Sequence, residues 1–224
     1  MQEQISVTGM ILKAEPVGEY DRRVVILTRE RGKVAAFARG ARKQGSRLLA
    51  STNPFCFGQF RLYEGRTAYG IAESSISNYF EEFREDFEAA CYGMYFLEII
   101  DYYTRENNDE KEMLKLIYQS LRALLHEGFS NNLVRYIFEI KALALNGEYP
   151  GPPTRQQPYL SSTLYTLEFI ANSSVEKLYT FTVNEQVLAE LSQISDFFRK
   201  RFVDRKMKSL EILDEMKFHV EKHV

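Results

Sequence analysis

Cationic side chains are concentrated between residues 22 and 47. These 26 residues carry nine lysines and arginines and a single acid, Glu30. The cations are Arg22, Arg23, Arg29, Arg31, Lys33, Arg39, Arg42, Lys43 and Arg47. Cations at this density suit a polyanion, because each phosphate that they neutralise releases condensed counterions. We therefore expect a nucleic-acid-binding surface here, with solubilising surface charge as the simpler alternative.

Aromatic side chains near the cations are candidates for stacking on bases. Phe37, Phe55, Phe57 and Tyr63 occur within or shortly after the basic segment. A ring that stacks on a base of a single strand contributes about 1–3 kcal/mol. An aromatic residue in a strand more often packs in the core, so both roles stay open for each ring.

The distribution of charge favours a function for the cations. The whole chain has a formal net charge of −2, but residues 1–80 hold twelve lysines and arginines against seven acids. The remaining residues hold 17 against 24. A basic N-terminal part is thus joined to an acidic C-terminal part, which is typical of a chain that binds a polyanion through one domain.

No motif for catalysis is present. The chain contains no phosphate-binding loop, dinucleotide fingerprint, zinc-protease motif or nucleophile elbow, so we expect neither an enzyme nor a cofactor. Cys56 and Cys91 lack the paired spacing of a zinc site, and His219 and His223 lack a third ligand, so no metal is expected. Without a membrane-length apolar run or a signal peptide, we expect a cytoplasmic protein that does not bind the membrane.

The N-terminal part is predicted to form five short strands. β-Branched and apolar residues dominate 5–14, 22–28, 33–39, 55–63 and 67–73, with glycine, proline or charged turns between them. Five strands in this length, with glycines at bends, fit a small antiparallel barrel better than an open sheet. We predict an OB-type barrel over residues 1–79.

The period of the apolar residues changes after residue 80. Apolar residues recur every three or four positions in 83–100, 113–124, 133–143 and 187–202, which predicts helices there. A last helix is predicted over 209–222. Between the third and fourth of these helices, apolar and polar residues alternate over 159–183. We interpret this as a small β-ribbon at about 147–183. The predicted class is therefore α+β, with a helical domain over residues 80–224.

One segment resembles a known family. The run from Gly18 to Leu48 resembles the N-terminal signature of the bacterial recombination mediator RecO family, and the segment from Arg205 to Leu213 resembles its C-terminal motif. The matching N-terminal residues are Glu19, Asp21, Arg22, Gly32, Lys33, Arg39, Gly40, Ala41, Arg42, Lys43, Ser46 and Arg47. The family often carries a four-cysteine zinc module, which residues 147–183 lack, so zinc is not expected.

The resemblance implies a role in recombinational DNA repair. Family members bind single- and double-stranded DNA, anneal complementary strands, and act with RecR and the tail of the single-stranded-DNA-binding protein to load RecA, which places the protein at the nucleoid. The candidate DNA contacts are Arg22, Arg23, Lys33, Arg39, Arg42, Lys43 and Arg47. The candidate tail contacts are Arg135, Phe138, Lys141, Lys206 and Lys208, which match the family loosely. Ordinary cations of an amphipathic helix are an equal explanation for the latter.

Two other functions fit the same residues. An OB barrel also accepts RNA, so an RNA-binding adaptor is one alternative. A protein-interaction scaffold whose basic part meets an acidic partner is the other. Preference for DNA over RNA of equal sequence, and binding at low salt, distinguish the three.

Overall fold

The chain forms two compact units. The structure is a computed structural model that describes residues 4–65 and 68–221, apart from the side chains of residue 214 and residues 216–221. The first unit comprises residues 1–85 and 97–114, and the second comprises residues 86–96 and 115–224. Helices α2 (Phe87–Tyr103) and α3 (Lys111–Leu124) therefore each contribute residues to both units.

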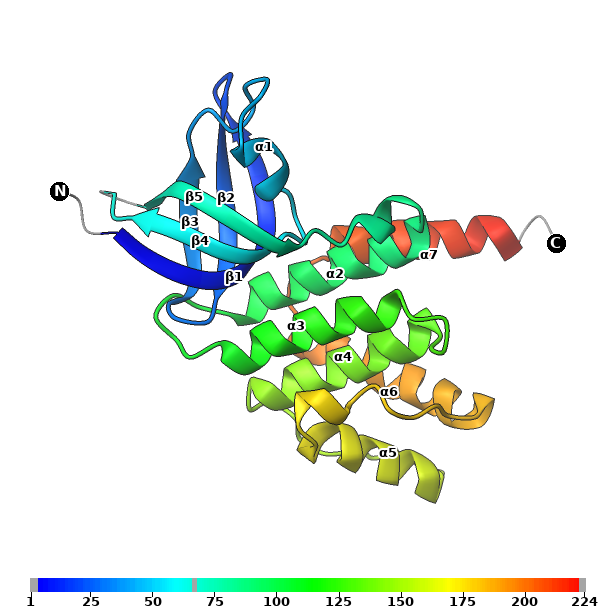
Figure 1. The fold of residues 1–224 in the computed structure, drawn as a ribbon. Helices are drawn as coiled ribbons and strands as arrows, with labels where there is room; N and C mark the ends of the chain where they lie inside the picture. The colour runs from blue at the N-terminus through cyan, green and yellow to red at the C-terminus, as the bar shows by residue number, and fades with distance from the viewer. Residues whose placement is uncertain (1–3, 66–67, 222–224) are drawn as a thin grey trace. The chain divides into compact units, whose positions relative to one another are not determined.

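Five strands close a barrel in the first unit. They are β1 (Gln4–Val17), β2 (Asp21–Thr28), β3 (Gly32–Ala38), β4 (Phe57–Tyr63) and β5 (Tyr69–Asn78). Their order is β1-β2-β3-β5-β4, with β3 and β5 parallel and the other neighbours antiparallel (Figure 1). This confirms the predicted five-stranded OB-type architecture.

A glycine pair allows β1 to change partners. The first half of β1 pairs with β4 and its second half with β2, with a register shift between Ile11 and Lys13. Gly9 stands opposite Gly58 at the crossover. A Cβ atom would lie 2.4 Å from the Leu27 carbonyl oxygen at Gly9 and 2.2 Å from the Ser75 carbonyl oxygen at Gly58. Only glycine permits this close approach, which closes the barrel.

Alternate residues of the strands build the core of the barrel. Its buried side chains include Val24, Ile26, Val34, Ala36, Phe60 and Leu62. Because strand residues alternate between faces, the residues between them point outward. A short helix, α1 (Leu48–Ser51), follows the loop after β3, and the Ser51 hydroxyl accepts a hydrogen bond from Ser74 on β5 at 2.7 Å.

The second unit is helical. Its helix α4 (Asn131–Leu145) packs against α5 (Ser161–Asn172) and α6 (Glu185–Phe202), and α7 (Lys208–Glu221) follows. Ser130 caps α4 and Asn184 caps α6, each accepting a hydrogen bond from a backbone N–H of the first turn. The helices predicted from apolar periodicity are confirmed. Among the described residues, no helix has the length and apolar character needed to cross a membrane.

The predicted β-ribbon at 147–183 is wrong. The described structure has α5 and a short 3₁₀ helix (Val175–Lys177) in this range, and no strand. Thr163, Thr166, Leu167 and Ile170 are the buried residues of α5, and their spacing is helical. The β-branched and aromatic residues of this range favour strands by their intrinsic propensity. Burial of one helical face against the rest of the unit outweighs that propensity, so the segment forms a helix.

Candidate nucleic-acid interface

Two of the predicted DNA contacts hold the first unit together. The Arg22 Nη1 atom donates hydrogen bonds to Leu49 O, Thr52 Oγ1 and Asn53 Oδ1 at 2.9–3.0 Å, which ties β2 to α1 and the turn after it. The Lys33 Nζ atom lies 3.0 Å from the Asp101 carboxylate at the end of α2 and is half-buried. Both cations already have protein partners, so their first role is structural.

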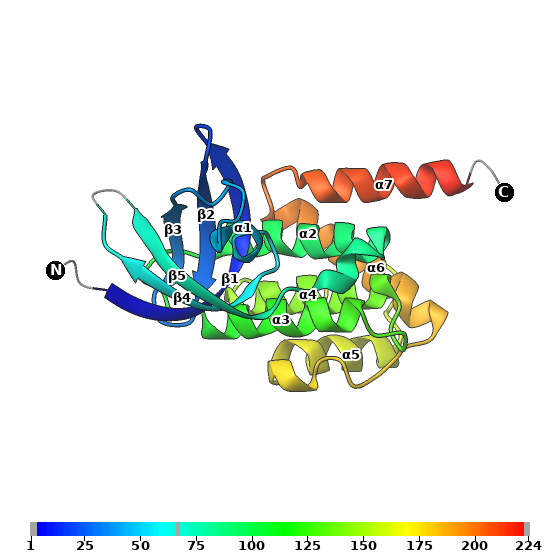
Figure 2. The ribbon, with the colours of Figure 1, turned by 45° about the horizontal axis from the view of Figure 1, so that its top comes forward.

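Four other candidates form an exposed surface. Arg39, Arg42, Lys43 and Arg47 lie in the loop between β3 and α1, and all four are exposed. We call them the basic loop surface. The loop between β3 and α1 lies at the end of the barrel at which the β1–β2 turn also lies (Figures 1 and 2).

Backbone hydrogen bonds fix the shape of this loop. The Gly40 N–H donates to Asp21 Oδ1 at 2.7 Å, and the Arg42 N–H donates to the Tyr20 carbonyl at 2.8 Å. The Lys43 Nζ atom lies 5.3 Å from the centre of the Tyr20 ring. The Arg42 Nη1 atom also donates to the Gly18 carbonyl oxygen at 3.2 Å. Because the anchoring groups are mainly backbone atoms, the loop is held in place while its cations remain exposed.

A row of outward-facing residues crosses the barrel wall. Strand register aligns Glu15, Arg23, Phe37, Gly70 and Tyr63 on neighbouring strands. The ring of Tyr63 covers Gly70, where a Cβ atom would lie 2.0 Å from the ring. Arg23 is exposed, and its ion pair with Glu15 is long at 3.8 Å. The row therefore combines one available cation with two aromatic rings.

The other two predicted stacking residues have different surroundings. Phe55 adopts a left-handed backbone with φ of 73°, and its ring packs on Phe83 at 4.8 Å between centroids. Phe57 begins β4 on its outer side and is half-buried. Phe37 and Tyr63 are thus the candidate rings that share a row with an exposed cation, which only the strand register could show.

Arg135 belongs to a buried network in the second unit. Its Nε atom donates to Glu139 Oε1 at 2.8 Å, and Tyr95 and Ser195 also donate to the Glu139 carboxylate. Arg135 is 7% exposed. Burial, together with the neighbouring Glu139 charge, raises the pKa of Tyr95 well above its usual value. The network joins α2, α4 and α6.

Three of the predicted tail contacts are buried in the structure. Phe138 is fully buried and stacks on Phe96 at 4.1 Å, while Lys141 is 5% exposed and donates to the carbonyls of Ala171 and Ser173. With Arg135 also buried, none of the three can contact a docked peptide. The sequence did not reveal this burial, because the long side chains of cations at the edge of an apolar helix face usually extend into solvent.

The remaining tail candidates border a basic pocket. Lys206 and Lys208 are exposed in the segment from Arg199 to Lys208, which carries six cations and one acid, Asp204. Arg199, Lys200, Arg205 and Lys206 line a pocket of about 270 Å³ with Met207 and Leu210. Asp204 and Glu211 also line it. The charge run was visible in the sequence, but its pocket was not predicted.

Cysteine, histidine and acidic side chains are the remaining groups that could react or bind a metal. Burial raises the pKa of the Cys56 thiol to about 11, so this thiol stays protonated near neutral pH. Among the described residues, no three histidine, cysteine or acidic side chains gather as a metal site. The side chains of His219 and His223 lie outside the described residues.

Two family models match this chain. The model described as Recombination protein O N terminal matches residues 1–80, and the model described as Recombination protein O C terminal matches residues 84–151 and 152–211. The chain belongs to the RecO family. The resemblance first seen between Gly18 and Leu48 is thereby confirmed.

Curated relatives extend the match to RecO proteins over most of the chain. The DNA repair protein RecO of Clostridium perfringens is 30% identical, with 92% of this chain and 95% of the relative covered. The DNA repair protein RecO of Clostridium novyi is 28% identical, with 93% of each covered. That of Bacillus pumilus is 35% identical over 65% of this chain and 57% of the relative.

Proposed function

We propose that this RecO-family chain is a DNA-binding recombination mediator in DNA repair rather than an enzyme. It binds single- and double-stranded DNA through its barrel, promotes annealing of complementary strands and, with RecR, assists the loading of RecA at the nucleoid on DNA coated by the single-stranded-DNA-binding protein. The observation that carries the DNA-binding part is the basic loop surface, whose four exposed cations lie on a loop anchored by its backbone.

The barrel offers different contacts to the two forms of DNA. Arg39, Arg42, Lys43 and Arg47 suit phosphates, which single and double strands both present. The rings of Phe37 and Tyr63 lie beside Arg23 on the barrel wall, where unpaired bases of a single strand can stack. Stacking needs an unpaired base, so the wall favours the single strand and the loop accepts either form.

Fluorescence anisotropy of a labelled single strand at several salt concentrations tests this proposal. We expect binding that weakens steeply with salt and that RNA of equal sequence displaces poorly. Replacing Arg39, Arg42 and Lys43 by alanine should lower the slope of log affinity against log salt by two or three contacts, at about 0.7 per contact for a single strand. Absence of binding at low salt would reject the DNA-binding role.

A matched control separates the loop from general charge. Alanine at Arg122, Lys177 and Arg201 removes three exposed cations outside the barrel. This variant has the same net charge as the loop variant, so we expect it to keep the wild-type slope. Equal losses in the two variants would mean that net charge, and not the loop, attracts DNA. Efficient displacement by RNA would favour the RNA-binding adaptor.

The basic pocket between α6 and α7 is the proposed docking site for the tail of the single-stranded-DNA-binding protein. Cations at its rim suit the acidic residues and terminal carboxylate of such a tail. The buried side chains of Met207 and Leu210 supply an apolar floor for its last side chain. This moves the site from Arg135, Phe138 and Lys141, which are buried, to the exposed surroundings of Lys206 and Lys208.

A further inference from the structure

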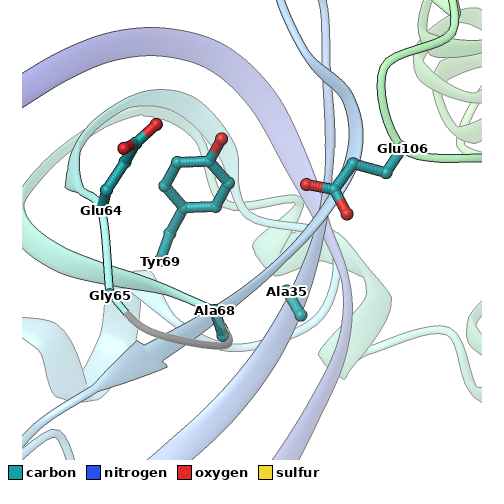
Figure 3. A pocket seen from close by; sticks show the side chains of 6 residues that line it. All are labelled: Ala35, Glu64, Gly65, Ala68, Tyr69 and Glu106. Atoms are coloured by element: carbon teal, nitrogen blue, oxygen red, sulfur yellow. The ribbon is translucent and has the colours of Figure 1, made fainter.

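A small pocket lies at the seam of the barrel where β3 and β5 meet. Among the described residues, two pairs join these strands, Ala36 with Tyr69 and Phe37 with Gly70. Beside them, a pocket of about 190 Å³ is lined by Ala35, Glu64, Gly65, Ala68, Tyr69 and Glu106 (Figure 3). A drug-sized ligand needs roughly 300–1,000 Å³. The pocket instead has the scale of a single planar ring.

The backbone fixes Glu106 at this pocket. Glu106 forms an antiparallel bridge with Gly32 at the start of β3. On either side, the Lys33 N–H donates to the Arg105 carbonyl and the Asn107 N–H donates to the Arg31 carbonyl, both at 3.0 Å. The loop between α2 and α3 is therefore held against the β2–β3 turn, and it presents the Glu106 carboxylate near Ala35 (Figure 3).

The chemistry of the lining selects a particular ligand. The exposed carboxylate of Glu106 repels phosphate, so the sugar-phosphate backbone of a nucleic acid stays outside. The half-buried ring of Tyr69 gives an aromatic wall for a planar group. Carboxylates accept hydrogen bonds from an exocyclic amino group, such as N4 of cytosine, whereas thymine presents a carbonyl oxygen at that position.

We propose that this pocket receives one unpaired base of a bound single strand and prefers a base with an exocyclic amino group to thymine. The inference rests on the proposed DNA binding, and it adds a base preference to a surface that otherwise contacts phosphates and stacks on bases of any type. The phosphates remain with Arg23 and the basic loop surface, while one base turns into the seam. A divalent cation is a poorer occupant, since no third acidic, histidine or cysteine ligand joins the pocket among the described residues.

The test compares labelled oligo(dC) and oligo(dT) of equal length, both of which stack weakly. We expect the wild-type protein to bind oligo(dC) about fivefold more tightly, the lower end of the range for one good base contact. Glu106→Gln should bring the ratio of the two affinities close to one, because an amide both donates and accepts. The salt slope should not change, because no phosphate contact is lost.

A second carboxylate variant controls for charge. Glu82→Gln removes one exposed acid in the same unit but outside the pocket. It should leave the ratio of affinities at the wild-type value, even if binding to both oligonucleotides increases. Equal wild-type affinity for oligo(dC) and oligo(dT), or a preference that Glu106→Gln leaves intact, would overturn the base pocket but leave the proposed DNA binding standing. Failure to bind either oligonucleotide at low salt would overturn the proposed DNA binding, and the base pocket with it.

Discussion

The loop after β3 and helix α4 both carry cations beside aromatic rings, but they use them in opposite ways. In the loop, Arg42 and Lys43 are exposed, and Lys43 lies over the ring of Tyr20. In α4, Arg135 and Lys141 are 7% and 5% exposed and donate to protein oxygen atoms. Residue type is the same in the two regions, whereas the partners of the charged groups differ.

The difference follows from the free energy of burying a charge. A cation removed from water needs close acceptors, or its desolvation is not offset. Glu139 and two backbone carbonyls meet this need in α4. In the loop, the Asp21 carboxylate accepts from a backbone N–H and not from a cation, and the Arg42 Nη1 atom donates to the exposed Gly18 carbonyl oxygen at 3.2 Å. The charges therefore stay in contact with solvent and within reach of a ligand.

The largest expected effect tests the buried side of this comparison. Arg135→Ala leaves the carboxylate of Glu139 in the interior without its cation, and removing one partner of a buried ion pair costs about 3–5 kcal/mol. We expect the free energy of unfolding, measured by urea denaturation, to fall by this amount. DNA binding by the barrel should persist under conditions in which the variant remains folded.

An exposed cation provides the control for this prediction. Lys206 has a side chain that is 90% exposed. Lys206→Ala should change the free energy of unfolding by less than about 0.5 kcal/mol, as is usual for surface substitutions. A similar small loss for Arg135→Ala would show that the Glu139 network contributes little, and that the contrast between α4 and the loop is not energetic.

The sequence predicted the elements of the barrel better than the roles of its cations. Alternation and turn residues locate all five strands, because each strand buries one face and exposes the other. The same information cannot show that Arg22 reaches three acceptors in and after α1, since these lie 27–31 residues away. Long-range partners arise only when the barrel closes.

The errors in the second unit have a related cause. Residues 161–172 are rich in residues that favour strands, but packing against α4 and α6 stabilises a helix there. On α4, the apolar stripe is so wide that Arg135 and Lys141 fall within the buried face. Their acceptors include residues 139, 171, 173 and 196, of which only Glu139 is near Arg135 in sequence.

Two neighbouring arginines sharpen the comparison within the barrel. Arg22→Ala removes the hydrogen bonds to α1 and the turn after it, so we expect unfolding to become about 1.5–3 kcal/mol easier, the range for hydrogen bonds to a charged group. Arg23→Ala removes a long surface ion pair and should change stability by less than about 0.5 kcal/mol. For single-stranded DNA, Arg23→Ala should lower the salt slope by about 0.7. Denaturation and anisotropy together check both variants, and the reverse pattern of effects would contradict a structural Arg22 and a DNA-contacting Arg23.

The smallest expected effect concerns the basic pocket of the second unit. Replacing Lys206 and Lys208 by alanine should weaken binding of a synthetic acidic peptide that ends in phenylalanine by about fivefold at low salt, because rim charges each contribute up to about 1 kcal/mol. The loss should shrink as salt screens the charges. Alanine at Arg122 and Lys177, two exposed cations outside the pocket, is the matched control and should leave the affinity unchanged. If both double variants lose affinity equally in a peptide titration, the peptide responds to the overall charge of the helical unit, and the pocket has no specific role in holding it.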